Sequence, residues 1–326
     1  MKGSSMHGLQ GLPSARGFVG LARFSLTSLG DYILPPFTSR VMKAVLLKAS
    51  CLQGLSAMYS GRSVGKPVTI RVLKTLKGRP LYKTTAGPSH VFKVRRGDVL
   101  VGEVGFYGGP GPPPLDMVSC SGEEVDIGYA SFSLETLEAE VNSLESLGEW
   151  HDRIVVDIVT PLTITARLLA PPGLRPLLKG KPKAYRLLAA PGYIIGQAVR
   201  EWAMVASGMD PVRSLRLARR VALYAELLVE EVDFRLRPVT AIYGRSDNGD
   251  LLKVRGITGS IVLEPLDEDI GLVAWKALRL ASFLGLGKSR SIGFGEIVVS
   301  PGRAGASAGS QPLGERSSAH ALQEDS

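Results

Sequence analysis

The sequence is poor in cysteine, histidine and aromatic residues. It has two cysteines, four histidines and 6% aromatic residues in a chain of 326 residues. Cys51 and Cys120 lie far apart and form no Cys-x-x-Cys pair, which argues against a disulfide framework, a zinc ribbon and a thioredoxin-type motif. We therefore expect two ordinary buried thiols. No spacing among the histidines suits a metal site, so no metal is expected.

Long hydrophobic runs are also missing. No stretch approaches the roughly 18 uninterrupted apolar residues of a membrane helix, and residues 1–17 lack the apolar segment of a secretory signal. We expect a cytoplasmic protein with no membrane partner. With 44% hydrophobic and 21% charged residues, the chain can bury real cores, and its length allows two domains.

Acidic residues are absent from a long basic segment. Residues 40–96 contain 13 lysines and arginines and no Asp or Glu, whereas residues 97–152 contain 12 acidic residues and no Lys or Arg. The whole chain has 39 basic and 30 acidic residues, a net charge of +9. If the basic block lies on one surface, its field would concentrate a polyanion, and nucleic acid is the expected partner. The alternatives are charges solvated on unrelated faces, or an acidic small molecule, which needs only a few cations.

The order of expected elements repeats. Residues 1–16 and 301–326 have the composition of loose tails. Each half between them has the order strand, helix, two strands, helix, strand, which predicts an α+β chain of two tandem ferredoxin-like domains, residues 17–150 and 151–300. The strands are expected at 18–29, 68–73, 91–106, 154–169, 233–243, 251–263 and 292–300, and the helices at 39–58, from Ser133 to Leu147, and at 191–209, 211–232 and 267–284.

The sharpest local signal is the glycine-rich run at residues 285–295, GLGKSRSIGFG. Four glycines let a backbone approach a ligand closely, and Lys288 and Arg290 add charge, so contact with phosphates is a plausible task. The run is not a Walker loop, because Ser282 stands where the first glycine would be and a helix precedes it. It is not a dinucleotide fingerprint, because Arg290 replaces the third glycine. The structural alternative is a tight helix-to-strand connection that needs positive φ.

This run resembles the C-terminal glycine-rich loop of the RAMP superfamily of CRISPR proteins. Weaker landmarks in the same order are similar to those of its pre-crRNA-processing endoribonucleases: LPPFT at 34–38, KPVTI at 66–70, IVTPL at 158–162 and RGITG at 255–259. The resemblance implies a pair of ferredoxin-like domains that grip a CRISPR repeat and cut it without a metal or other cofactor. Attack by the 2′-hydroxyl would leave a 2′,3′-cyclic phosphate and a 5′-hydroxyl.

Many members of that family place a histidine after the first helix, but residues 58–66 contain none. By resemblance to members that use basic residues instead, we expect Tyr32 to orient the 2′-hydroxyl, and Lys43 and Lys66 to neutralise the phosphate or donate a proton. The expected RNA-binding residues are Arg40, Lys48, Arg62, Lys93, Arg95, Arg96, Gly285, Gly287, Lys288, Ser289, Arg290, Ser291, Gly293 and Gly295.

Two alternatives stay open. The first alternative to such an enzyme is a non-catalytic RAMP subunit that holds crRNA in an effector complex, which the missing histidine favours. The second is an RNA-binding or RNA-modifying protein outside CRISPR systems. RNA is the expected partner, with subunits of a CRISPR effector complex and a second copy of the chain as further candidates. The low aromatic content favours recognition of backbone and hairpin shape over extensive base stacking.

Overall fold

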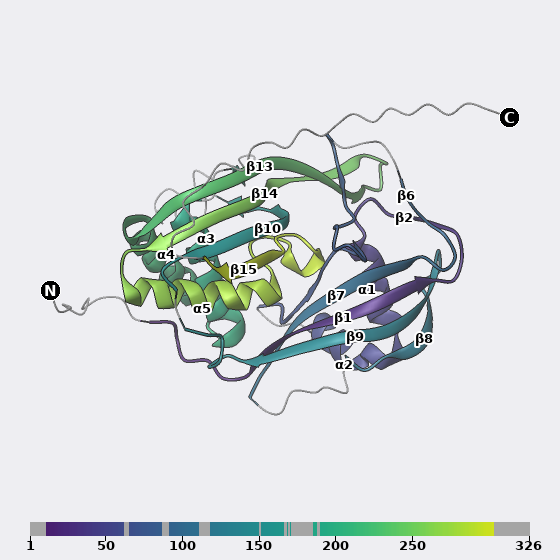
Figure 1. Ribbon diagram of the computed structural model, residues 1–326, viewed down its shortest axis with the longest axis horizontal. Helices are drawn as coiled ribbons and strands as arrows, with labels where there is room; N and C mark the ends of the chain where they lie inside the picture. The colour runs from purple at the N-terminus through teal and green to yellow at the C-terminus, as the bar shows by residue number, and fades with distance from the viewer. Residues whose placement is uncertain are drawn as a thin grey trace.

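The computed structural model of the chain describes residues 11–61, 65–86, 91–110, 118–149, 151–165, 168, 170, 185–187 and 190–302. Two antiparallel sheets lie side by side, one built mainly from each half of the chain (Figure 1). The strand order is β3-β7-β1-β9-β8 in the first sheet, with β4 on β7, and β15-β10-β14-β13-β5 in the second.

The strands of the first sheet are β1 (Phe18–Ser28), β3 (Val68–Ile70), β4 (Lys74–Thr75), β7 (Val99–Gly108), β8 (Ser121–Asp126) and β9 (Ser131–Ser143). Those of the second are β5 (Lys83–Thr84), β10 (Ile154–Leu162), β13 (Val229–Arg245), β14 (Leu251–Pro265) and β15 (Ile297–Pro301). Two small sheets pair β2 (Tyr32–Leu34) with β6 (Phe92–Val94), and β11 (Ile164–Thr165) with β12 (Tyr185–Arg186). The helices are α1 (Ser39–Lys48), α2 (Gln53–Ser60), α3 (Pro191–Glu201), α4 (Pro211–Leu228) and α5 (Glu268–Leu284), with short turns η1 (Ser50–Leu52), η5 (Trp202–Ala206) and η6 (Arg290–Ile292).

The second half has the predicted ferredoxin-like connection. Its order is β10, α3 and α4, β13, β14, α5, β15, and the central strand β10 lies between β14 and β15. Local signals explain its boundaries. The Asp267 carboxylate accepts a hydrogen bond from the Ile270 amide and caps α5. Gly249, in the turn between β13 and β14, has a φ of 84°, as the Asn-Gly pair predicts.

The first half departs from the prediction at residues 133–147. We expected a helix there, but residues 131–143 form the strand β9, which pairs with β1 along its length and with β8. Phe132 and Leu134 are fully buried two positions apart, whereas Leu137, which belongs to the helical spacing, is 54% exposed. Residues 131–143 follow the alternating burial of a strand and not the spacing of a helix, because β1 supplies backbone hydrogen-bonding partners along their length. The first half therefore uses a β8–β9 hairpin in place of its second helix.

The helix expected at 39–58 is also interrupted. Ala49 has extended backbone angles (φ −67°, ψ 127°), which end α1, and the chain bends by 93° before it continues. The Glu123 carboxylate accepts hydrogen bonds from the amides of Ser50 and Cys51 at 2.6 and 2.9 Å, so a side chain from β8 satisfies the start of the next turn. Within the described residues no single helix is long and apolar enough to cross a membrane. Residues 39–48 and 50–60 together have the length and composition of a membrane span, but only as a bent pair.

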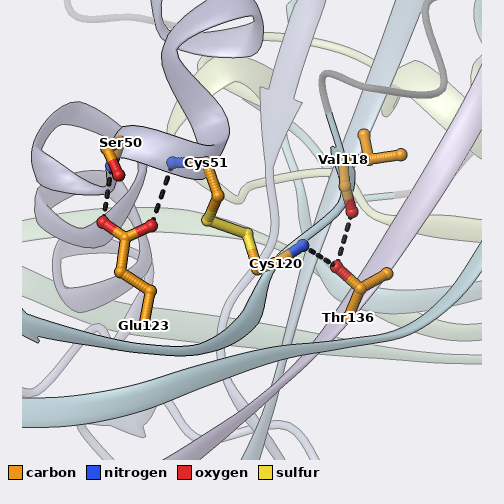
Figure 2. The surroundings of a disulfide bond; sticks show 6 residues. All are labelled: Ser50, Cys51, Val118, Cys120, Glu123 and Thr136. Carbon is orange, nitrogen blue, oxygen red and sulfur yellow. Dashed lines mark hydrogen bonds between the residues drawn. A yellow bond between two sulfur atoms is a disulfide. The ribbon is translucent and has the colours of Figure 1, made fainter.

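The two cysteines form a disulfide, which corrects the expectation of free thiols. Cys51, at the turn between α1 and α2, is bonded to Cys120, just before β8, with a Cα–Cα distance of 5.3 Å (Figure 2). Figure 2 shows Glu123 on one side of the bond and Thr136 on the other, where Thr136 accepts from the Cys120 amide and donates to the Val118 carbonyl oxygen. A separation of 69 residues gives no sequence signal for pairing, because only the fold brings the two Cα atoms together.

Three further observations tie the halves together. The strand β5, from the first half, pairs with Ala241 and Ile242 of β13 in the second sheet. A shared apolar cluster combines β1, α5 and η5, and a smaller one stacks Phe37 on Phe294 at 4.3 Å. The predicted N-terminal tail is partly packed, since the Trp202 indole donates to the Pro13 carbonyl oxygen at 3.0 Å. The chain thus folds as two sheets with an extensive common boundary.

Candidate functional site

Two of the three predicted catalytic residues meet at one tyrosine. The ammonium group of Lys43, on the exposed face of α1, lies 5.8 Å from the centroid of the Tyr59 ring. Lys66, between α2 and β3, donates from Nζ to the Tyr59 carbonyl oxygen at 3.4 Å and to the Gly61 carbonyl oxygen at 3.0 Å. The break at Ala49 turns α2 back, so that its end lies near α1. Lys43 thus contacts the ring of Tyr59, and Lys66 contacts its main-chain carbonyl oxygen.

Tyr59 is a residue that our sequence reasoning did not select. Its ring is partly buried, and this burial raises the pKa of its hydroxyl above the usual value. The group therefore stays protonated at neutral pH and can donate a hydrogen bond. The sequence carries only a weak signal for it, because Tyr59 stands in residues 58–66, the stretch after the first helix that lacks a histidine.

Tyr32, the third predicted catalytic residue, has different neighbours. It lies on the short strand β2, opposite Val94 of β6, and its ring centroid is 6.2 Å from that of Phe132. The contacts described for Tyr32 are thus with the apolar core of the first half, whereas Lys43 and Lys66 meet at Tyr59. Its assignment to the 2′-hydroxyl stays a prediction.

The glycine-rich run connects α5 to β15, as its structural reading predicts. Gly285, Gly287, Gly293 and Gly295 all have positive φ. At Gly293 a Cβ would lie 2.9 Å from the Ser39 Cβ, so a glycine lets the run approach the first turn of α1. There the Ser39 hydroxyl donates to the Ile292 carbonyl oxygen at 2.7 Å. The run is therefore packed against the helix that carries Lys43.

Several amides of this run donate hydrogen bonds within the protein. The Lys288 amide donates to the Thr163 carbonyl oxygen, the Gly293 amide to that of Arg290, and the Gly295 amide to that of Pro161. Ser289 is the only described non-glycine residue with positive φ, at 65°. Contacts of Gly285, Gly287, Lys288, Ser289, Ser291, Gly293 and Gly295 with RNA stay predictions.

Arg290 lies in the interior, which corrects the expectation that its side chain is displayed for RNA. It is 6% exposed, and its Nε lies 2.9 Å from the Glu201 carboxylate. Its Nη1 donates to the Thr69 hydroxyl and the Leu284 carbonyl oxygen, both at 3.1 Å, and its Nη2 donates to the Lys66 carbonyl oxygen at 2.7 Å. The guanidinium is engaged on all three nitrogens. Arg290 thus positions the backbone of Lys66 from the other half of the chain.

A second buried ionic cluster spans the same boundary. Glu103 on β7 lies 2.8 Å from Arg71 and 2.7 Å from Lys74, and Lys74 also lies 2.6 Å from Glu296, which precedes β15. Burial raises the pKa of Glu103, but Arg71 and Lys74 outweigh it and lower the pKa to about 2. Glu103 is therefore ionised at every ordinary pH. These residues were not selected from the sequence because their partners are far apart in the chain.

The other predicted RNA-binding cations that the structure describes have exposed side chains. Arg40 and Lys48 share α1 with Lys43; the Arg40 guanidinium lies against Gly244 of β13, and Lys48 donates to the Asp126 carbonyl oxygen at 2.8 Å. Lys93 projects from β6, and Arg95 and Arg96 follow in the next turn. Arg62 lies outside the described residues. These five side chains are exposed on elements of the first half of the chain, and their contact with RNA stays a prediction.

His151 is the histidine that lies within the described residues, and its neighbour is an aromatic ring. His151 packs edge-on against Trp275, with ring centroids 4.5 Å apart, and the Trp275 indole donates to the Leu147 carbonyl oxygen. Within the residues that the structure describes, no group of three or more His, Cys, Asp or Glu side chains could hold a metal ion. His7, His90 and His320 lie outside these residues.

Comparison with known families matches both halves of the chain. Residues 21–142 match the family described as the Cas6 N-terminal domain, and residues 156–297 match the family described as CRISPR-associated endoribonuclease Cas6. Two curated proteins of Saccharolobus solfataricus, named CRISPR-associated endoribonuclease Cas6 1 and Cas6 2, are similar to it. The first is 27% identical over 85% of this chain and 94% of its own length. The second is 28% identical over 84% of this chain and 93% of its own length.

Solved structures show the same fold. A Cas6 of Thermus thermophilus has a TM-score of 0.51 at 17% identity, over 88% of this chain and 100% of its own. A Cas6 product complex has a TM-score of 0.52 at 19% identity, with the same coverage. These neighbours have tandem ferredoxin-like domains, the architecture expected from the sequence. With both halves matched in order by the family descriptions, the chain belongs to the Cas6 family of CRISPR-associated endoribonucleases.

Proposed function

We propose that this protein is a metal-independent endoribonuclease that binds and cleaves the repeats of CRISPR precursor RNA. The observation that carries the proposal is the meeting of Lys43 and Lys66 at Tyr59, beside the basic face of α1, in a member of the Cas6 family. The curated relatives are named endoribonucleases, and one structural neighbour is a product complex, which supports the same reaction class.

The proposed reaction is an internal transesterification. The 2′-oxygen of the ribose before the cut attacks the adjacent phosphorus and loses its proton, and the bond from phosphorus to the 5′-oxygen breaks. The departing 5′-oxygen takes up a proton. The products are a 2′,3′-cyclic phosphate and a 5′-hydroxyl, and no redox partner or water is consumed.

The lysines are suited to the charged stages of this reaction. Charge develops on the phosphate oxygens during attack, and two fixed ammonium groups stabilise it. A protonated lysine can also supply the proton that the leaving 5′-oxygen requires. Tyr59, whose hydroxyl stays protonated, can donate a hydrogen bond to the phosphate. We assign electrostatic stabilisation and proton donation to Lys43 and Lys66, and keep Tyr32 as the candidate that orients the 2′-hydroxyl.

The glycine-rich run enters this proposal as a support for the lysines. Ser39 ties α1 to Ile292, and Arg290 ties the Lys66 backbone to Glu201. The helix that carries Lys43 and the main chain of Lys66 are thus both attached to the connection between α5 and β15. Preorganised charges need no rearrangement when the phosphate charge develops, which is the physical advantage of such support.

The test uses a labelled repeat RNA in EDTA, beside a copy with a single 2′-deoxy sugar at the cut position. We expect the ribose substrate to be cut and the deoxy substrate to be bound but intact. Tight binding without cleavage of either RNA would favour a non-catalytic RAMP subunit, the alternative favoured by the lack of histidine in residues 58–66. Absence of binding to both RNAs would overturn both functions.

A further inference from the structure

Solvent-exposed aromatic rings are rare in this protein. Among the described residues, Tyr129 and Phe234 are the aromatic residues with exposed side chains, and they are 50% and 57% exposed. Tyr129 lies in the turn between β8 and β9, and Phe234 lies on β13 in the other half of the chain. A tyrosine ring is apolar on its faces and polar at its tip, so it suits a surface site where a flat ligand covers one face.

The turn that carries Tyr129 is fixed by its own hydrogen bonds. The Gly128 amide donates to the Asp126 carboxylate at 2.7 Å, and the Ile127 amide donates to the Ala130 carbonyl oxygen at 2.9 Å. Gly128 has a φ of 94°, which a glycine adopts without strain. Ile127 and Ala130 are buried, which anchors the turn in the core of the first half. The backbone on both sides of Tyr129 is therefore ordered before any ligand binds, which lowers the entropic cost of binding.

The same turn lies against α1, the helix that carries Lys43. The Lys48 ammonium group donates to the Asp126 carbonyl oxygen at 2.8 Å. Burial raises the pKa of the Tyr129 hydroxyl, and the nearby Arg40 guanidinium opposes this rise. Arg40 and Lys43 are both exposed and three positions apart on α1, so they are neighbours on one face of the helix. Tyr129 thus lies beside the cations of α1.

The surroundings of Tyr129 match the two parts of a nucleotide. A base presents a flat face that stacks on aromatic rings, and the phosphate next to it is anionic. The ring of Tyr129 supplies the first partner, and the exposed guanidinium of Arg40 supplies the second. Arg40 also lies against Gly244 of β13, so this place is a boundary between the two halves of the chain. Every base has such a flat face, so the stack requires no particular base.

We propose that the ring of Tyr129 stacks on one unpaired base of the repeat RNA while Arg40 contacts a phosphate of the same strand. This inference rests on the proposed function, because it assigns a further contact to the same substrate. The stacked base fixes the position of the strand along α1, and with it the position of the phosphate that Lys43 meets. Tyr129 binds the substrate and takes no part in proton transfer.

The first measurement is the affinity for a labelled repeat RNA with a single 2′-deoxy sugar at the cut position, which is expected to bind without being cut. Tyr129→Ala should weaken binding by about five-fold or more, the usual loss for one stacked base. Tyr129→Phe keeps the ring and should bind as tightly as the wild type. Phe234→Ala is the matched control, since it removes the other exposed ring of the described residues, and its affinity should not change.

The second measurement shows whether a base is the partner of the ring. A series of the same RNA, each copy lacking one base, is bound to the wild type and to Tyr129→Ala. At one position, loss of the base should weaken binding to the wild type and have little further effect in the variant, because both changes remove the same contact. At the other positions the two proteins should lose affinity equally. A misfolded variant would not show this dependence on a single position.

The outcomes separate this inference from the proposed function. In a wild type that binds and cuts the ribose RNA, unchanged affinity of Tyr129→Ala would overturn the stacking contact and leave the endoribonuclease standing. Equal losses for Tyr129→Ala with every RNA of the series, or a loss in Tyr129→Phe as large as in Tyr129→Ala, would also overturn it. A wild type that does not bind the repeat would overturn the proposed function and this inference together.

Discussion

The Nη2 atom of Arg290 lies 2.7 Å from the carbonyl oxygen of Lys66, although 224 positions separate the two residues in the chain. This hydrogen bond joins the glycine-rich connection of the second half to the candidate catalytic segment of the first. The same guanidinium binds Glu201 at the end of α3. The geometry around Lys66 therefore depends on a buried ion pair in the other half of the molecule.

Removal of either lysine should slow cleavage more than binding. For Lys43→Ala and Lys66→Ala we expect single-turnover rates in EDTA to fall by about 10²-fold or more, the usual range for loss of acid–base or charge assistance. Lys253→Ala is the control, because Lys253 is an exposed lysine of β14 outside the predicted catalytic and RNA-binding residues, and its rate should stay near that of the wild type. Equal losses for all three variants would indicate general phosphate binding instead.

The two tyrosines can be separated by removal of a single oxygen. If Tyr59 donates a hydrogen bond to the phosphate, Tyr59→Phe should lower the cleavage rate by about ten-fold, the order of one hydrogen bond to a charged group. Tyr32→Phe should lower it only if Tyr32 orients the 2′-hydroxyl. Each rate is measured at saturating protein. An unchanged rate for a variant removes that tyrosine from the mechanism.

Truncation of Arg290 should destabilise the fold. Arg290→Ala leaves the Glu201 carboxylate buried without a counter-charge, which typically costs about 3–5 kcal/mol of the free energy of unfolding. Denaturant unfolding measures this cost, and Arg290→Ala combined with Glu201→Ala should lose less than the sum of the two single variants. Lys253→Ala, an exposed change, should stay within about 0.5 kcal/mol of the wild type. Strict additivity would show that the pair is not coupled.

Acid should lower the free energy of unfolding by protonating Glu103. Its pKa is held at about 2 in the folded state against an ordinary value of 4.5, so its contribution to stability is complete above pH 4.5 and is lost as the pH falls toward 2. The difference corresponds to roughly 3 kcal/mol at neutral pH. We expect Glu103→Gln to be less stable than the wild type at pH 7, with the gap narrowing below pH 4.5. A gap independent of pH would contradict this.

Reduction of the disulfide should lower the unfolding temperature. The disulfide closes a loop between two residues that are 69 positions apart. The conformational entropy that the unfolded chain loses stabilises the folded state by about 4 kcal/mol. Thermal unfolding with and without a phosphine reductant measures the effect. The variant Cys51→Ser with Cys120→Ser should unfold at the lower temperature in both conditions. A wild type insensitive to reductant, with two titratable thiols before treatment, would contradict the bond.

The sequence predicted the second half better than the first for identifiable reasons. Local signals explain this: Asp267 caps α5, and the Asn248-Gly249 pair forms the turn between β13 and β14. The strand β9 was mistaken for a helix because its leucines also satisfy a spacing of three and four. Only the pairing with β1, more than 100 residues earlier, decides between the two patterns.

The candidate site shows the same difference between local and long-range signals. Lys43 and Lys66 could be selected from the resemblance, and the structure brings both to Tyr59. The burial of Arg290 could not be predicted, because it depends on Glu201, 89 residues away, and on Thr69 in the other half. A charged residue in a glycine-rich run appears suited to phosphate, and only its surroundings show that it supports the fold.

The most direct test of metal-independent cleavage is the chemical identity of the product ends. Wild-type protein is incubated with repeat RNA in EDTA under single-turnover conditions, and the fragments are weighed by mass spectrometry. Attack by the 2′-hydroxyl predicts an upstream fragment that ends in a 2′,3′-cyclic phosphate and a downstream fragment that begins with a 5′-hydroxyl. Fragments with a 3′-hydroxyl and a 5′-phosphate, or RNA that stays bound and uncut, would contradict it.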